Sequence, residues 1–294
     1  MRSLITKPYI QLMRPANIIT AIADVLAGYA IAFHHFGEFT VSNLSLIAAT
    51  IGLYGGGVVL NDVFDAKLDA VERPERPIPS GKIPVNRAMA FGFSLLLFGC
   101  TAAWLNHSMS GLIAMAIALL AVVYDMYGKH NSVLGPINMG MCRGGNLLLG
   151  MSAKPEMIND WWYLSVIAIV YIAAITMVSR GEVNGGNPKT LYAAGILYLI
   201  VIAAQLYVAY NSAHQFPATV ILLAVFGLFI FYPLIKAVND PVGPNIGKAV
   251  KAGVISLILM DAAWCMAFGG LYLGLITLLL LPLSFLIAKF FAVT

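Results

Sequence analysis

The amino-acid sequence predicts an all-α integral membrane protein, built as a bundle of nine to ten transmembrane helices. Of its 294 residues, 60% are apolar and only 10% are charged, and the mean hydropathy is +0.87. An ordinary soluble domain carries roughly 25% charged residues. Apolar runs near the roughly 20 residues that a helix needs to cross the hydrocarbon core recur along nearly the whole chain. We therefore expect most of the protein to lie within the lipid bilayer.

The expected spans are the apolar runs between polar breaks, taken in chain order. Arg2, Lys7 and Arg14 precede the first run in the manner of a signal peptide, but many more runs follow, so we expect an uncleaved first span. Only Phe268, Gly269 and Gly270 separate the last two runs, which leaves the count at nine or ten. The runs are 17–35, 43–60, 87–105, 109–127, 134–152, 161–179, 190–210, 216–236, 249–268 and 271–290.

The basic residues favour one face of this plan. Sixteen of the 17 Lys and Arg residues, Arg143 among them, are assigned to the two ends of the chain or to the connections after spans two, four, six and eight. Only Lys154 is left for the opposite face. By the positive-inside rule the basic face is cytoplasmic, which predicts a multi-pass protein of the cell inner membrane.

The net charge of +4 is explained by this topology and by contact with anionic lipid headgroups, so no nucleic-acid partner is expected. The connections are too short for a soluble domain, so residues 1–294 are expected to form a single polytopic domain. The longest connection follows span two. Its length and its charge make it the first place to look for function.

Three carboxylates gather where span two ends. The chain reads Asn61-Asp62-x-x-Asp65-x-x-x-Asp69, and on a continuing helix the spacings of three and four residues place all three aspartates on one face. Like charges repel unless a cation lies between them, and magnesium prefers carboxylate, water and phosphate oxygens. A solvated acidic helix end is the alternative. Acids at the membrane boundary favour the metal site.

A proline-stiffened basic loop follows directly, from Arg73 to Lys82. The guanidinium of Arg76 can hold a phosphate through two parallel hydrogen bonds, and Ser80 can add a donor. The alternative is a positive-inside loop with turn prolines. Its position beside the acidic helix favours the phosphate-binding interpretation.

Two further breaks on the same face carry cations. Tyr124 and Lys129 end span four, and Arg180, Glu182 and Lys189 follow span six. Each break offers a positive charge suited to a diphosphate bound through magnesium. Taken singly, each is equally well explained as a topology determinant.

Together these residues resemble the UbiA superfamily of intramembrane prenyltransferases. The resemblance is carried by Arg14-Pro15-x-Asn17 before span one, by the Asn61–Asp69 acidic motif, by Arg76-Pro-Ile-Pro-Ser80-Gly, and by Tyr124 followed by Lys129. An acidic motif of this spacing with RPxxSG just after it is a specific combination. The hydropathy plan agrees over nearly the full length.

The resemblance implies a helical bundle around a central, lipid-accessible cavity. It implies an isoprenyl diphosphate held through magnesium, whose allylic cation alkylates an aromatic or other lipophilic acceptor. It assigns roles residue by residue: Asp62, Asp65, Asp69 and Glu182 would hold magnesium, and Asp62, Asp65, Lys129 and Glu182 would be catalytic. Asn61, Arg76, Ser80, Lys129, Arg180 and Lys189 would bind the diphosphate, and Asn17 and Tyr124 would line the cavity or contact the acceptor.

One departure from the family pattern stands out. Between spans six and seven, where members usually carry a second aspartate pair, this chain reads Ser-Arg-Gly-Glu-Val-Asn-Gly-Gly over residues 179–186, with Glu182 as its single acid. A motif of this kind resembles a divergent, EboC-like branch. Either Glu182 and Arg180 together replace the pair, or ionisation of the diphosphate is impaired.

Two other functions compete with prenyl transfer. A non-catalytic relative that binds or moves an isoprenoid or secondary metabolite would explain the missing aspartate pair. An unrelated secondary transporter should carry frequent charges within its spans. Here Asp24 and Asp261 are the main ones, and each either faces a cavity or is satisfied by a neighbouring helix.

Overall fold

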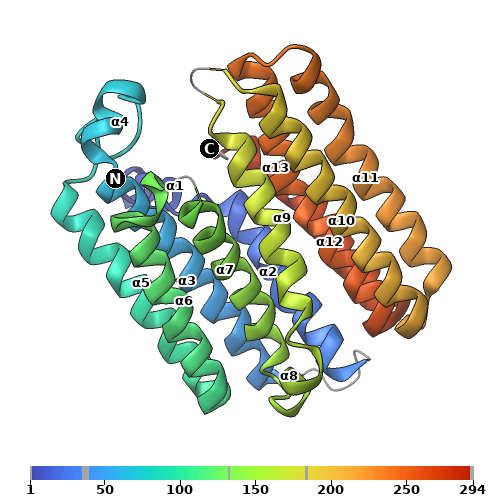
Figure 1. Ribbon diagram of the computed structural model, residues 1–294. Coiled ribbons are helices and arrows are strands. Elements are labelled where there is room, and N and C mark those ends of the chain that lie inside the picture. The colour runs from blue at the N-terminus through green and yellow to red at the C-terminus, as the bar shows by residue number, and fades with distance from the viewer. Residues whose placement is uncertain (1, 35–39, 132, 183–184, 292–294) are drawn as a thin grey trace.

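The computed structural model describes residues 2–34, 40–131, 133–182 and 185–291, and this part of the chain is built of α-helices joined by turns and one short 3-10 helix. The long helices lie side by side in one bundle, with α4 projecting from one end and α8 closing the other (Figure 1). The first seven are α1 Arg2–Leu12, α2 Pro15–Phe33, α3 Val41–Phe64, α4 Ala66–Glu72, α5 Val85–Asn106, α6 Ser108–Met126 and α7 Leu134–Met151. The remaining six are α8 Glu156–Trp161, α9 Leu164–Ser179, α10 Pro188–Ser212, α11 Phe216–Asn239, α12 Gly243–Leu278 and α13 Leu280–Ala288.

The long helices confirm the all-helical membrane fold that the hydropathy predicts. Seven helical stretches of the described chain are long and apolar enough to cross a membrane, and the apolar helix α9 is shorter. Helix α7 occupies the fifth expected span but carries more polar residues. Most observed ends lie within a few residues of the predicted ones, because long apolar runs define helices well and their ends poorly.

The last two expected spans are a helical hairpin. Gly270 has φ +82°, a conformation that glycine adopts readily, and the chain reverses there. Phe268 stacks edge-on against His34 at the C-terminal end of α2, whereas the Ser284 hydroxyl donates to the Ala16 carbonyl at its N-terminal end. The segment after Gly270 therefore runs back along the whole of α2. Within the described residues this geometry supports ten helical passes rather than nine.

Glycines let the helices of the N-terminal half approach closely. A Cβ added at Gly150 of α7 would lie 2.2 Å from the Val25 carbonyl oxygen of α2, and one at Gly28 would lie 2.1 Å from the Leu147 carbonyl oxygen. A methyl group cannot occupy either position without moving a backbone. Small residues at such crossings are the usual basis of helix association in lipid, where the hydrophobic effect does not drive it.

Helix α1 was not expected from the sequence. It is 11 residues long and close to neutral in hydropathy, so it gives no span signal. Its last turn packs nonetheless: Leu12 is buried, and the Tyr9 ring meets the Phe91 ring of α5 edge-on at 5.2 Å. This packing holds the segment that leads into Arg14 against the bundle.

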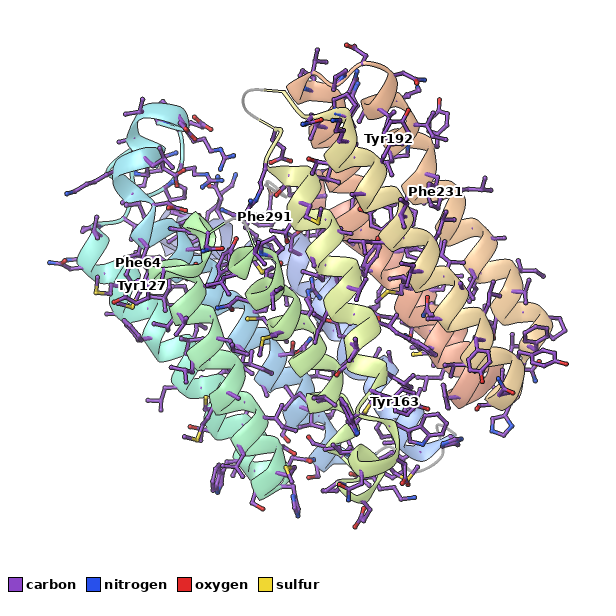
Figure 2. All side chains as sticks on the ribbon, viewed as in Figure 1. Phe64, Tyr127, Tyr163, Tyr192, Phe231 and Phe291 are labelled. Atoms are coloured by element: carbon purple, nitrogen blue, oxygen red, sulfur yellow. The ribbon has the colours of Figure 1, made fainter. Side chains whose placement is uncertain are left out.

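The two halves of the bundle have different cores. Helices α9 to α12 share an almost wholly apolar core that includes the rings of Tyr171, Tyr198 and Phe226, which contact one another at tilted angles. Helices α2, α3, α6 and α7 instead surround buried polar side chains and a cavity. Figure 2 marks the two ends of the bundle, with Phe64 and Tyr127 toward one end and Tyr163 at the other.

Candidate functional site

The acidic motif does not lie on one continuous helix. Helix α3 ends at Phe64, Asp65 adopts a non-helical ψ of 1°, and α4 begins at Ala66. The expectation that all three aspartates share one face of a continuing helix is therefore wrong. The break turns the chain so that Asp62 and Asp69 meet through a common partner, while the Asp65 side chain pairs elsewhere.

Two arginines neutralise the buried pair of carboxylates, and one of them bridges the pair. Arg76 Nη1 lies 2.8 Å from Asp69 Oδ2 and 3.3 Å from Asp62 Oδ1. Arg14 Nη2 donates to the same Asp62 oxygen at 2.6 Å. Asp62 and Asp69 are only 4% and 3% exposed, so each charge is compensated by guanidinium rather than by water.

Arg14 holds its position in an unusual backbone conformation. It is the residue before α2 and has φ 49° and ψ 65°, the left-handed region that non-glycine residues rarely adopt. Pro15, at the first turn of the helix, fixes the chain beyond it. Strain of this kind persists where the surroundings impose it, which is common at functional sites. Here the strained residue is the one that contacts Asp62.

Helix α6 and the turn after it supply the other side of the site. The Lys129 ammonium forms an ion pair with Asp65. Asn61 Nδ2 donates to Asp125 Oδ1 at 2.8 Å, which joins α3 to α6. The second carboxylate oxygen of Asp125 is buried and has no hydrogen-bond partner in the described part of the chain. Such an oxygen is costly to bury and indicates a missing partner.

A cavity of about 290 Å³ opens next to these groups. Arg14, Asn61, Tyr124 and Asp125 lie at its charged end, which places the predicted cavity residue Tyr124 on its wall. The other lining residues are mostly apolar near that end and polar further in: Thr50, Leu53, Tyr54, Gly57, Val58, Ile117, Ala121, Met139, Cys142, Arg143 and Asn146.

The remaining predicted residues lie further from this cluster. Asn17 is buried in the first turn of α2 but does not line the cavity. Ser80 is exposed and its hydroxyl contacts the Pro77 carbonyl at 3.4 Å. Arg180 donates to the Asn131 carbonyl at 2.7 Å, beside the turn that carries Lys129. Lys189 is exposed at the start of α10.

Glu182 is a partly buried acid on the far side of the same end. Burial raises the pKa of its carboxyl above the usual value, and the positive charge of Arg73 acts in the opposite direction. No ion pair to Glu182 is found among the described side chains. Val183 and Asn184, which complete the divergent second motif, lie outside the described residues.

Sequence reasoning missed three residues of this region. Arg14 begins a quoted motif and Asp125 lies between Tyr124 and Lys129, but neither was given a role. Arg143 was assigned to a cytoplasmic connection, which is wrong: it lies in the middle of α7, is 5% exposed, and pairs with Asp24 of α2. The signal was a charge inside an apolar run, which is rarely without function in a membrane protein. Without Arg143, 15 of the other 16 basic residues still fit one face.

The donor set suits magnesium, although the described residues contain no group of three acidic, histidine or cysteine side chains placed to hold a metal ion. Asp62, Asp65 and Asp69 offer hard carboxylate oxygens, which magnesium prefers, and Asp125 offers an unpartnered one. Arginine and lysine at present neutralise the three motif aspartates. The residues are therefore compatible with the predicted cofactor.

Fold and site together define a class. A multi-pass helical bundle that presents clustered aspartates, arginines and a lysine at the mouth of a membrane-embedded cavity has the architecture of an intramembrane prenyltransferase. The sequence model of the UbiA prenyltransferase family matches residues 21–241. The chain therefore belongs to the UbiA prenyltransferase family and is a multi-pass integral membrane protein.

Two curated relatives with the same name match this chain over different lengths. The chain is 26% identical over 274 residues to digeranylgeranylglyceryl phosphate synthase of Methanothermobacter thermautotrophicus, which covers 87% of this chain and 95% of that protein. It is 34% identical over 151 residues to the protein of the same name from Methanococcoides burtonii, covering 49% of this chain. That second match spans only 54% of the relative's length.

Solved structures confirm the fold. A UbiA homologue from Archaeoglobus fulgidus bound to GPP and Mg²⁺ superposes with a TM-score of 0.69 at 13% identity, over 96% of this chain and 99% of that one. A structure of digeranylgeranylglyceryl phosphate synthase gives 0.68 at 23% identity, over 91% of this chain and 99% of that one. At these identities the likeness concerns the fold alone.

Proposed function

We propose that this protein transfers a prenyl group from an isoprenyl diphosphate to a lipophilic acceptor within the membrane, with magnesium as cofactor. One observation carries the proposal: the aspartates of the first motif are gathered with Arg14, Arg76 and Lys129, next to a cavity whose charged end is lined by Arg14, Asn61 and Asp125. Such a set can bind a metal–diphosphate and stabilise it as it departs.

The chemistry asked of these residues is ionisation of an allylic carbon–oxygen bond. The electron pair leaves with the diphosphate, so positive charge must already be in place where negative charge develops. Asp62, Asp65 and Asp69 are the residues that would hold magnesium, which when bound supplies Lewis-acid stabilisation of the phosphate oxygens. Arg14, Arg76 and Lys129 would then turn from the carboxylates toward the leaving group.

The cavity and Asp125 serve the second half of the reaction. Leu53, Val58 and Ile117 line the wall next to the charged end, and an apolar wall keeps water from the allylic cation. The acceptor atom bonds to the prenyl carbon and loses a proton. The free Asp125 oxygen lies at this end of the cavity and is placed to take that proton.

The acceptor is the open part of the proposal. The sequence analysis favoured an aromatic acceptor, whereas the relatives' name denotes a glyceryl phosphate with two geranylgeranyl groups, whose precursor is not aromatic. Magnesium and GPP are seen together in the Archaeoglobus fulgidus homologue. We therefore propose an isoprenyl diphosphate as donor and keep both acceptor classes for the test.

A non-catalytic binding or transport role is the second candidate, and Glu182 is the observation that favours it. Where the family usually has an aspartate pair, the described part of this chain has one acid facing Arg73. The EboC-like placement rests on the same segment, and the relatives found here bear another name. It stays a prediction.

The proposal includes the orientation of the protein in the membrane. Residues 1–294 form one polytopic domain of the cell inner membrane, with the acidic motif and its basic partners on the cytoplasmic face. The distribution of Lys and Arg supports this orientation. Access of a membrane-impermeant thiol reagent to cysteines introduced at exposed positions 75 and 160, at opposite ends of the bundle, would test it in intact cells.

Turnover by the purified protein tests the function itself. Labelled geranylgeranyl diphosphate is offered with aromatic and glyceryl acceptors, in magnesium and in EDTA. Asp160→Asn is the matched control for Asp62→Asn, because Asp160 is exposed on α8 at the opposite end of the bundle. Product that needs magnesium and Asp62 but not Asp160 supports transfer. Magnesium-dependent binding of the diphosphate without product over the whole panel would support the binding role instead.

A further inference from the structure

A second charged cluster lies deep in the bundle, apart from the acidic motif. Arg143 of α7 donates from Nη1 to Asp24 Oδ2 of α2 at 2.5 Å, and its Nη2 bonds the Thr20 hydroxyl. Asp261 of α12 lies beside Asp24. Arg143, Asp24 and Asp261 are 5%, 1% and 1% exposed. Burying these groups between helices is expensive, so the cluster calls for an explanation.

Neighbouring side chains fix Asp24 but leave the arginine incompletely bonded. Asn146 Nδ2 donates to Asp24 Oδ2 at 3.0 Å and to the Ala21 carbonyl at 2.7 Å, and Thr50 donates to Asn146 Oδ1 at 2.7 Å. A guanidinium has five N–H groups. Arg143 uses two hydrogen bonds within the described structure, so donors remain free.

The arginine that carries these donors lines the cavity. Arg143, Asn146, Thr50 and Tyr54 all line it, and the Arg143 guanidinium stacks over the Tyr54 ring with its carbon 5.0 Å from the ring centre. Tyr54 and Asn61 are seven residues apart on α3, which separates the two polar ends of the cavity by roughly 10 Å at 1.5 Å per residue. The cavity is thus polar at both ends and apolar between them.

The character of the deep end limits what can occupy it. A prenyl tail would leave the Arg143 donors buried without partners, so the tail has to take another path. An anion is also disfavoured, because Asp24 already offsets the arginine charge and Asp261 lies close by. What remains is a neutral oxygen that accepts hydrogen bonds.

On the basis of the function proposed above, we propose that Arg143, positioned by Asp24 and stacked on Tyr54, binds a neutral carbonyl, hydroxyl or ether oxygen of the acceptor. The nucleophilic atom of that acceptor lies toward Asn61 and Asp125, so the acceptor carries its second oxygen several ångströms from the reacting atom. The cluster is a specificity-determining subsite and takes no part in bond breaking.

Three matched naphthols test this subsite with geranylgeranyl diphosphate as donor. In 4-methoxy-1-naphthol a neutral oxygen stands opposite the nucleophile, in 4-ethyl-1-naphthol a carbon of similar shape replaces it, and in 4-hydroxy-1-naphthoate an anion does. For the wild type we expect kcat/KM for the methoxy compound to exceed that of the ethyl compound by about 10-fold or more, as for a hydrogen bond to a charged group. The difference should lie mainly in KM.

A double variant removes the subsite while keeping the buried charge balanced. Asp24→Asn with Arg143→Gln removes the ion pair as a unit, because deleting the arginine alone would leave a buried carboxylate uncompensated. In this double variant the preference for the methoxy over the ethyl compound, measured as the ratio of their kcat/KM values, should fall to about one. In Asp24→Asn combined with Asp261→Asn no carboxylate is left to offset the arginine charge, so the preference should move to the naphthoate. A purely structural role would produce neither shift.

Binding is measured separately, so that failure of the subsite and failure of prenyl transfer can be told apart. Cys142 lines the cavity and its alkylation by a maleimide, in a Cys100→Ser background, reports occupancy without turnover. If wild-type protein transfers nothing to any naphthol, prenyl transfer to these acceptors fails, and protection of Cys142 by the methoxy compound alone still supports the subsite.

Three results would overturn the proposal. One is equal methoxy preference in the wild type and the double variant. Another is a wild-type preference for the naphthoate over the methoxy compound. The third is absence of both turnover and Cys142 protection with 4-methoxy-1-naphthol.

Discussion

The two halves of the bundle differ in how their acidic side chains are paired with basic ones. In the N-terminal half, the aspartates of the acidic motif are each joined to Arg14, Arg76 or Lys129, next to the charged end of the cavity. At the equivalent end of the C-terminal half, Glu182 stands beside an apolar core and faces Arg73 without a direct ion pair among the described residues. The first motif therefore gathers three carboxylates and three cations, which suits the diphosphate binding proposed above, whereas the second motif can contribute at most one acidic charge.

Loss of Asp62 is expected to have the largest effect. Asp62→Asn keeps the shape of the side chain but removes the charge shared by Arg14 and Arg76, so turnover should fall by roughly 10² to 10³, as when a preorganised charge-stabilising group is lost. Steady-state turnover of labelled diphosphate measures this. An activity close to that of Asp160→Asn would contradict this prediction, because the first motif would then matter no more for turnover than a surface acid.

Removing the Asp125 carboxylate, which lines the cavity, should lower turnover somewhat less than the loss of Asp62. Asp125→Asn retains one oxygen for the bond from Asn61 but cannot accept the acceptor's proton, and general-base removal lowers rates by about 10². The fall should appear in kcat, with diphosphate binding unchanged by calorimetry. A selective loss of magnesium binding in this variant would instead reassign Asp125 to the metal.

The tight helix crossings of the N-terminal half should be sensitive to a single methyl group. Gly150→Ala places a Cβ 2.2 Å from a backbone oxygen, so we expect a loss of about 1–3 kcal/mol, as for other overpacked sites. Thermal unfolding in detergent measures it. Gly195→Ala in α10 is the matched control, because its nearest contact is the Leu234 side chain at 3.4 Å, and its midpoint should hardly move.

The variant Glu182→Gln measures how much the second motif contributes to turnover. A lone, partly buried acid with a raised pKa contributes less than a bridged cluster, so turnover should fall by about 10-fold or less, the range of one ordinary hydrogen bond. Comparing Glu182→Gln with Asp62→Asn in one assay gives the ratio of the two motifs. Equal losses would show that the single glutamate does the work of the missing aspartate pair.

The smallest expected effect concerns the backbone of Arg14. Both Arg14→Ala and Arg14→Gly lose the contact with Asp62, but only glycine relieves the positive φ. The alanine variant should therefore be less stable than the glycine variant by about 1 kcal/mol. Thermal unfolding midpoints of the two variants, measured under the same conditions, test this difference in stability. If alanine is at least as stable, the left-handed conformation at this position is not under strain.

Some site residues could be read from the chain because their partners are close in sequence. Asp62 and Asp69 are seven residues apart and Arg76 seven further on, so a charged cluster was predictable even though the break at Asp65 was not. A one-residue break has no hydropathy signal. Lys129 was expected to face a diphosphate, and the structure adds that it pairs with Asp65.

What the sequence determined by itself was the bundle and its membrane plan, because apolar runs of span length and the placement of Lys and Arg are local properties that lipid and water act on directly. What only the tertiary structure decided was which distant charges meet. Asp24 and Arg143 lie 119 residues apart and Asn61 and Asp125 lie 64 apart. Their pairing depends on glycine-mediated helix crossings such as that of α2 with α7, and no pattern within one helix specifies its neighbour.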